Sequence, residues 1–214
     1  MVDFLQMLAE LPEAVSESAR SRERRNAEAQ CLIAPPPAGT PLLVSLALAF
    51  EHTGIYLGGN RVAELNGDGH VKAVSLTRFI NGTPDGTWQV RNGTRIFAAC
   101  DVCTRRPLAR ARSLETARAA IEAGSNQMEY DFAQLNCHLF TAACVLGIPP
   151  GERRFRSLFG GGVASIGKLE RLLAKALNHD KGICWRAVRR DKERFHYSLS
   201  PGKRIRLAVE SVLK

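Results

Sequence analysis

The run from His52 to Asn66 most restricts what this chain can fold into, because two β-type segments flank a glycine turn. His52 to Leu57 and Arg61 to Asn66 are short segments of mixed apolar and polar residues. The residues between them, Gly58-Gly59-Asn60, readily adopt the positive φ that a tight hairpin needs. The pattern therefore predicts an antiparallel hairpin.

The register of this hairpin decides which polar side chains share a face. A three-residue loop pairs Leu57 with Arg61, which sets His52 opposite Asn66 and diagonal to Glu64. Because side chains alternate along a strand, His52, Glu64 and Asn66 then lie on one face of the sheet. A slip of one residue would move Glu64 to the other face. On the expected register, either Glu64 or Asn66 can contact His52.

A cysteine stands at the start of a predicted helix. Asn136-Cys137-His138-Leu139-Phe140 opens an apolar run that continues to Leu146. Free backbone N–H groups and the helix dipole favour a thiolate at such a position. Cys144, deeper in the run, has the pattern of a small buried hydrophobe, and that role is open to Cys137 as well. His138 projects about 100° away on a helix, so we expect it to face a different partner.

These residues form the set that a cysteine hydrolase or acyltransferase requires. Such an enzyme needs a thiolate, an imidazole within hydrogen-bond reach and a polar group that orients the imidazole. We assign Cys137 as nucleophile, His52 as general base and then acid, and Glu64 as the orienting acceptor, with Asn66 as the alternative. The backbone N–H of Cys137 would be one donor of an oxyanion hole.

Composition limits the setting of this chemistry. The net charge is +9, and ten basic against three acidic side chains between residues 181 and 214 supply +7 of it. The amino terminus lacks the pattern of a secretory signal, so we expect six reduced cysteines in a cytoplasmic protein. The longest apolar run, residues 41–50, is about half of what a bilayer requires, so no transmembrane segment is predicted.

The chain divides into a core domain with two extensions. Residues 1–34 have the pattern of two helical pieces, and the prolines at 35–37 mark the boundary to a core domain over residues 35–150. In this core, Leu42 to Leu48 is expected to be a buried strand, and Ser113 to Ala123 a helix capped by Ser113. Residues 151–214 form a basic extension, in which Ser165 to Leu177 is an amphipathic helix docked on the core.

Cys100-Asp101-Val102-Cys103 has the spacing of a zinc or redox motif. A structural zinc site takes four ligands, and the sequence has neither a second such motif nor a paired histidine motif. We therefore expect core or surface thiols here, and no metal or cofactor.

Two motifs together resemble a known family. The run from His52 through Tyr56, Gly58 and Glu64, followed much later by Asn136-Cys137-His138-Leu139-Phe140, resembles the lecithin retinol acyltransferase family within the NlpC-type cysteine hydrolases. The resemblance covers about residues 38–147. It implies an α+β fold of the circularly permuted papain-like type, in which an antiparallel sheet packs against the helix that carries the cysteine. Where vertebrate acyltransferases of this type have a second histidine, this chain has Glu64.

The resemblance implies an acyl-enzyme formed on Cys137, with a lipid ester, a peptide bond or a cell-wall amide as the substrate. The alternative function is a catalytically silent basic module that binds an anionic membrane surface or nucleic acid. Peripheral membrane contact through the basic C-terminal region is compatible with either function. The sequence does not decide between hydrolysis and acyl transfer, and it does not determine the oligomeric state.

Overall fold

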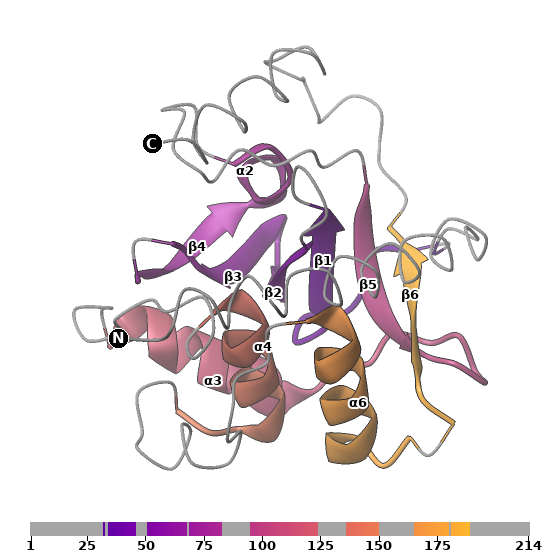
Figure 1. Ribbon diagram of the computed structural model, residues 1–214. Coiled ribbons are helices and arrows are strands. Elements are labelled where there is room, and N and C mark those ends of the chain that lie inside the picture. Colours follow the sequence, from indigo (N-terminus) through magenta and orange to yellow (C-terminus); the bar gives the residue numbers. More distant parts are fainter. Residues whose placement is uncertain are drawn as a thin grey trace, which may run out of the picture.

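The computed structural model of the chain describes residues 32, 34–45, 51–67, 69–82, 95–123, 136–149, 165–179 and 181–188. Within these residues lies one six-stranded antiparallel sheet in the order β4-β3-β2-β1-β5-β6 (Figure 1). The strands are β1 (Pro41–Ser45), β2 (Glu51–Gly58), β3 (Arg61–Leu65), β4 (Val71–Ser75), β5 (Ile96–Asp101) and β6 (Ile183–Ala187).

Helices cover both faces of this sheet. Three of them, α3 (Ala111–Glu122), α4 (Cys137–Leu146) and α6 (Ile166–Ala176), lie side by side on one face, and the short helix α2 (Leu76–Asn81) lies on the other (Figure 1). The fold is therefore mixed α+β, and the helix that carries the cysteine packs against an antiparallel sheet. None of the described helices is both long enough and apolar enough to cross a bilayer.

Alternation along the strands divides the core into two layers. Leu43 and Ile55 pack with the three-helix side, whereas their neighbours Leu42 and Tyr56 pack with Phe79 of α2. This is the period of two that a pleated strand imposes on its side chains. The central strands β1 and β2 are therefore buried from both sides, which fixes their register firmly.

The hairpin has the predicted register along its body and a different turn. Ile55 pairs with Ala63 and Tyr56 with Val62, as expected, but a bulge then pairs Gly58 with Arg61. The turn is the two-residue step Gly59-Asn60, with φ of 55° and 66°. Two successive positive φ values are typical of the type I′ turn, whose twist matches the flanking strands. The predicted three-residue loop is wrong by one residue, because Gly58 joins the ladder.

The helix that begins with Cys137 has well-defined ends. The side chain of Asn136 accepts a hydrogen bond from the backbone N–H of Leu139 at 3.0 Å, and Gly147 ends the helix with φ of 69°. An amide side chain at the N-cap and a left-handed glycine after the last turn are common helix boundaries. The prediction that Cys137 opens the helix is confirmed.

Two other predicted helices have different outcomes. Helix α6 is capped by Ser165 and buries Ile166, Leu169 and Leu173, so the docked amphipathic helix is confirmed. Helix α3 begins at Ala111, after an extended Arg110 that makes no side-chain cap. The prediction of Ser113 as the cap is wrong, because the helix starts two residues earlier and Ser113 lies on its buried face.

Parts of the expected domains lie outside the described residues, and elements from both extensions contact the central sheet. Strand β1 is described only to Ser45, since residues 46–50 lie outside the described part, as do the predicted helices of residues 1–30 and the tail after residue 188. Leu32 forms a parallel bridge with Val188, and its N–H donates to the carbonyl of Ala187 at 2.8 Å. Strand β6, within the predicted C-terminal extension, is part of the central sheet.

Candidate active site

Cys137 is buried at the first residue of α4, beside the beginning of β2. Its Sγ atom lies 4.0 Å from the carbonyl oxygen of Glu51, and the residue is 6% exposed. The Thr53 hydroxyl donates to the backbone carbonyl of Cys137 at 3.0 Å, which fastens the helix start to the strand. The cysteine that the sequence places at a helix start is therefore held directly against the histidine strand.

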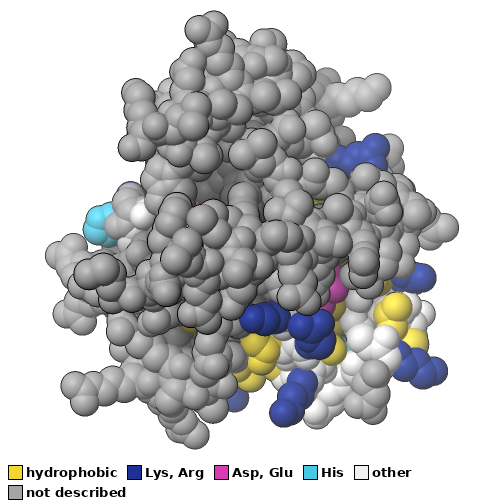
Figure 2. Space-filling model, viewed as in Figure 1, with side chains coloured by type: hydrophobic (Ala, Val, Ile, Leu, Met, Phe, Trp, Pro, Cys, Tyr) yellow, Lys and Arg dark blue, Asp and Glu magenta, His cyan; other side chains and the backbone are white. Residues whose placement is uncertain are grey.

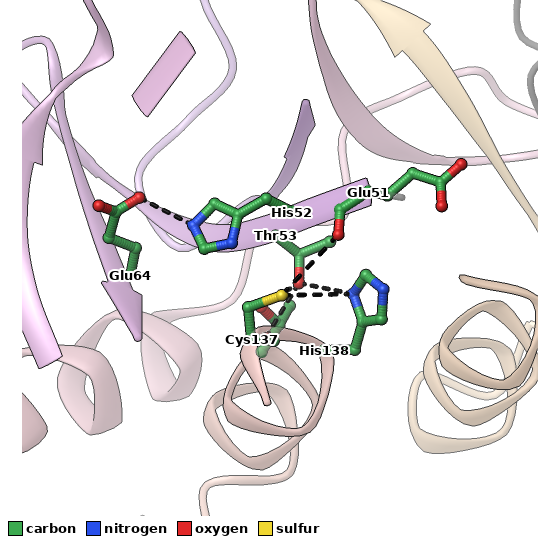
Figure 3. A network of polar contacts seen from close by, with 7 residues as sticks. Glu51, His52, Thr53, Glu64, Cys137 and His138 are labelled. Carbon is green, nitrogen blue, oxygen red and sulfur yellow. Dashed lines mark hydrogen bonds and ion pairs between the residues drawn. The ribbon is translucent and has the colours of Figure 1, made fainter. Parts of the chain in front are cut away.

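His52 and Glu64 form a buried pair on neighbouring strands. Nε2 of His52 lies 2.8 Å from Oε2 of Glu64, and the two side chains are 8% and 1% exposed. The ring of Phe79 packs on the imidazole, with centroids 5.4 Å apart. The other ring nitrogen of His52, Nδ1, points toward the Cys137 sulfur (Figure 3). The predicted residues Cys137, His52 and Glu64 therefore lie together, with His52 between the other two.

Asn66 is close to this group in sequence but does not replace Glu64. It lies in the turn after β3, where its backbone N–H donates to the carbonyl of His70 at 2.9 Å. Its side-chain Oδ1 is buried and finds no hydrogen-bond partner within the described part of the chain. The expected choice between the two acceptors is thus decided by geometry, since the carboxylate of Glu64 makes the short contact with His52.

The surroundings of Cys137 favour a thiolate. Burial by itself raises the pKa of this thiol, but the charges of His138 and His52, and hydrogen bonds with both rings, together hold that pKa well below its ordinary value. A charge that is buried persists only when it is paired and hydrogen-bonded, and two imidazoles meet this need. The site is therefore suited to a thiolate next to a protonated imidazole.

Two other buried cysteines, Cys144 and Cys100, show the opposite behaviour. Burial among apolar side chains raises the pKa of Cys144 above its ordinary value, and it raises the pKa of Cys100 to about 12. Cys144 lies in the core between α4 and its neighbours, as the sequence predicts. Burial alone therefore does not activate a thiol here, and the imidazoles at Cys137 make the difference.

A second polar network adjoins the thiol, and the sequence pattern did not predict it. Nδ1 of His138 lies 4.0 Å from the sulfur and 3.1 Å from the Thr53 hydroxyl, and the hydroxyls of Thr53 and Thr141 are 3.0 Å apart (Figure 3). We expected His138 to face a different partner from Cys137, and its ring does contact Thr53, but it also turns back toward the sulfur across the first helical turn. Thr141 follows Cys137 by one turn, so helical spacing could have revealed it.

The start of α4 also provides backbone donors. The first N–H groups of an α-helix have no intrahelical acceptor. In α4, the side chain of Asn136 accepts the hydrogen bond from the N–H of Leu139. The N–H groups of Cys137 and His138 belong to the same first turn, beside the sulfur. Together with the positive end of the helix dipole, they can stabilise negative charge that develops on a bound carbonyl oxygen.

The Cys100-Asp101-Val102-Cys103 motif lies at the far end of the sheet and forms a turn. Cys100 is buried on β5 opposite Cys184 of β6, whereas Cys103 is exposed. The carboxylate of Asp101 accepts the N–H of Cys103 at 3.0 Å and contacts Nδ1 of His179 at 2.7 Å. Within the described residues, no group of three or more His, Cys, Asp or Glu side chains is arranged to hold a metal ion.

Comparisons of the chain with family models, curated proteins and solved structures gave no significant match.

Proposed function

We propose that the protein is a thiol-dependent hydrolase or acyltransferase that forms an acyl-enzyme on Cys137. The observation that carries this proposal is the alignment of Cys137, His52 and Glu64, with a carboxylate 2.8 Å from one imidazole nitrogen and the sulfur on the side of the other. This is the order of groups that activates a nucleophile through an oriented base. The lowered pKa of the Cys137 thiol supports it independently of sequence motifs.

The residues account for each step of an acyl transfer. The Cys137 thiolate attacks the carbonyl carbon of an ester or amide, a C–S bond forms, and the carbonyl electron pair moves to the oxygen beside the N–H groups of α4. When the carbonyl re-forms, the C–O or C–N bond breaks and the leaving group takes a proton from His52 Nδ1. Water or an amine then gives a proton to His52 as it attacks the thioester, and Cys137 departs as a thiolate.

Glu64 acts through His52 in this mechanism. Its carboxylate accepts a hydrogen bond from the Nε2–H of His52, so the Nδ1 lone pair is the one directed at Cys137 and the substrate. The same carboxylate stabilises the imidazolium that forms when His52 holds a second proton. A carboxylate in this place performs the orienting role that a second histidine has in vertebrate lecithin retinol acyltransferases.

The fold supports assignment to the lecithin retinol acyltransferase-like branch of permuted papain-like enzymes. In the chain order the histidine strand comes first and the cysteine helix later, and the helix packs on that strand, as this family requires. The resemblance leaves three substrate classes: lipid esters, peptide bonds and cell-wall amides.

A thiol-reactive probe with site-resolved detection tests the proposal. We expect an iodoacetamide probe to label Cys137 at pH 6 faster than it labels the exposed Cys103. Labelling should vanish in Cys137→Ala, persist in Cys144→Ala and fall in His52→Gln, with circular dichroism showing that each variant is folded. If Cys137 reacts no faster than Cys103, the thiolate and the proposed function are both wrong.

A substrate panel then separates the classes. Release of fatty acid from phosphatidylcholine vesicles would assign lipid chemistry, and cleavage of muropeptides or of a peptide library would assign amide chemistry. Cys137→Ser provides the matched inactive control, because it removes the thiolate and changes only one atom. Binding to anionic vesicles or RNA without any turnover would instead support the alternative basic module.

That alternative has some support on the surface. Figure 2 shows Lys and Arg side chains over the part of this face where α6 lies, and the exposed residues of α6 include Lys168, Arg171 and Lys175. Exposed basic residues attract anionic partners at low salt without any chemistry. However, such a module does not need a buried carboxylate, two imidazoles and a thiol in contact, so we favour the enzyme.

A further inference from the structure

His138 is a buried titratable group that the acyl-transfer mechanism does not use. It is 5% exposed, and its Nδ1 contacts both the Thr53 hydroxyl at 3.1 Å and the Cys137 sulfur at 4.0 Å. Two imidazoles therefore approach one sulfur, one from β2 and one from α4. Either could in principle be the base, and the hydrogen positions in the network decide between them.

The hydrogen bonds around Thr53 can be counted. The Thr53 oxygen has three neighbours at hydrogen-bond distance: the carbonyl oxygen of Cys137 at 3.0 Å, the hydroxyl of Thr141 at 3.0 Å and Nδ1 of His138 at 3.1 Å. A hydroxyl donates one hydrogen and accepts two. A carbonyl oxygen only accepts, so the single Thr53 proton must go to Cys137, and Thr141 must donate to Thr53.

The third contact then needs its hydrogen from the histidine. If Nδ1 of His138 carried no proton, it and the Cys137 carbonyl oxygen would both be acceptors for the single Thr53 proton. One of these two buried contacts would then have no hydrogen and would bring two lone pairs together. With a proton on Nδ1, all three contacts hold a hydrogen. Buried polar atoms are satisfied in the great majority of cases, which selects the second arrangement.

We propose that His138 is a positioning residue that keeps its proton on Nδ1 and presents this N–H to the Cys137 sulfur and Thr53. His52 is then the imidazole that exchanges protons with the substrate, while His138 stabilises the thiolate at rest and when it departs from the thioester. The second role rests on the proposed function, whereas the proton position does not.

The groups that face the sulfur make this division of roles consistent. His52 approaches from β2, with Glu64 of β3 behind it, and the Glu51 carboxylate points away from the sulfur (Figure 3). Helices α3 and α6 contribute apolar side chains, such as Ala117 and Leu169, to the core around α4. His52 has a carboxylate to support its positive charge, whereas His138 has a hydroxyl acceptor that fixes only the proton position.

Nitrogen-15 NMR of histidine-labelled protein tests the proton position directly. We expect the ring hydrogen of His138 to be found on Nδ1 in the folded protein, with the signal assigned by its loss in His138→Asn. Thr53→Ser, which keeps the hydroxyl, should preserve this state, and Thr53→Val should lose it. A bare Nδ1 in the unmodified protein, or no difference between the two Thr53 variants, would overturn the proposal.

The effect on the thiolate is tested by the rate of Cys137 alkylation at pH 6. His138→Leu removes a hydrogen bond to a charged group, so we expect a decrease of about tenfold or more. His138→Asn places an amide N–H where Nδ1 stood and should recover part of this loss. His179→Asn, a histidine at the far end of the sheet, is the matched control. Equal rates for His138→Leu and the unmodified protein would overturn the proposal.

The two proposals fail in different ways. If no ester or amide is turned over but His138 keeps its Nδ1 proton and controls alkylation, the acyl chemistry is wrong and the positioning role stands. If substrate is turned over while His138→Leu leaves both the alkylation profile and kcat/KM unchanged, the positioning role is wrong and the enzyme stands.

Discussion

Replacing Glu64 by glutamine isolates the charge that supports His52. The amide has nearly the shape of the carboxylate, and its carbonyl oxygen can still accept the hydrogen of His52 Nε2 across the 2.8 Å contact. The packing of β2 against β3 is therefore retained. What is lost is the negative charge beside a ring that must become an imidazolium during the reaction.

The size of this loss follows from the burial of the pair. Both side chains are almost fully buried, at 8% and 1% exposure, so solvent screens the interaction weakly. A hydrogen bond to a charged group contributes about 1.5–3 kcal/mol, against about 0.5–1.5 kcal/mol for a neutral one. The difference, about 1–2 kcal/mol, corresponds to a decrease of roughly five- to thirtyfold in the population of the thiolate–imidazolium pair.

The assay is the rate of site-resolved Cys137 alkylation at pH 6, compared with kcat/KM on an activated thioester or ester. Both should fall by the same factor in Glu64→Gln, because both require the ion pair. Glu122→Gln, an exposed carboxylate on α3, controls for the loss of one charge and should change neither rate. If the Glu64→Gln variant is alkylated at Cys137 and turns over substrate at the same rates as the unmodified protein, the carboxylate neither orients His52 nor stabilises its imidazolium.

Three further predictions concern pH, packing and capping. Because the imidazoles hold the pKa of Cys137 below its ordinary value, its alkylation should persist below neutral pH and disappear only as the pH falls through that lowered pKa. Cys144, whose pKa burial raises, should stay unreactive up to alkaline pH unless the protein unfolds, and mass spectrometry of the alkylated peptides checks both. Gly54→Ala would place a Cβ 2.5 Å from the Ala63 carbonyl oxygen and 3.2 Å from the Phe79 ring, so urea unfolding should show a loss of about 1–3 kcal/mol together with slower Cys137 alkylation. Asn136→Ala removes the cap of α4 and should cost about 1 kcal/mol in the same unfolding assay, whereas Asn136→Ser should restore most of it.

Local sequence patterns predict much of the fold near the site. Two β-type segments around Gly59-Asn60 determine the hairpin, because few other residues accept the positive φ of that turn. The period of two then carries His52 and Glu64 to the same face, and the cap at Asn136 sets the helix start at Cys137. These features depend on neighbours within about a dozen residues, so pattern and turn chemistry suffice to predict them.

Other features depend on contacts that local pattern does not encode. The ring of His138 turns back toward the sulfur because it contacts Thr53 of β2, a strand that is far away in sequence but packs against α4. Helical geometry alone would direct the ring elsewhere. Strand β6 joins the sheet beside β5 because the sheet edge offers backbone partners, although its sequence lies in a basic segment. The helix start at Ala111 likewise reflects the packing of α3, which buries Ser113.

The sequence by itself determined the hairpin and the cysteine helix, since these follow from local periodicity and turn geometry, and it left Glu64 and Asn66 as alternative partners of His52. Only the tertiary structure decided that Glu64 and not Asn66 contacts His52, and that a second imidazole and two threonine hydroxyls surround the thiol. The physical reason is that these hydrogen bonds join atoms from β2, β3 and α4. Only the packing of the three elements brings those atoms within hydrogen-bond distance.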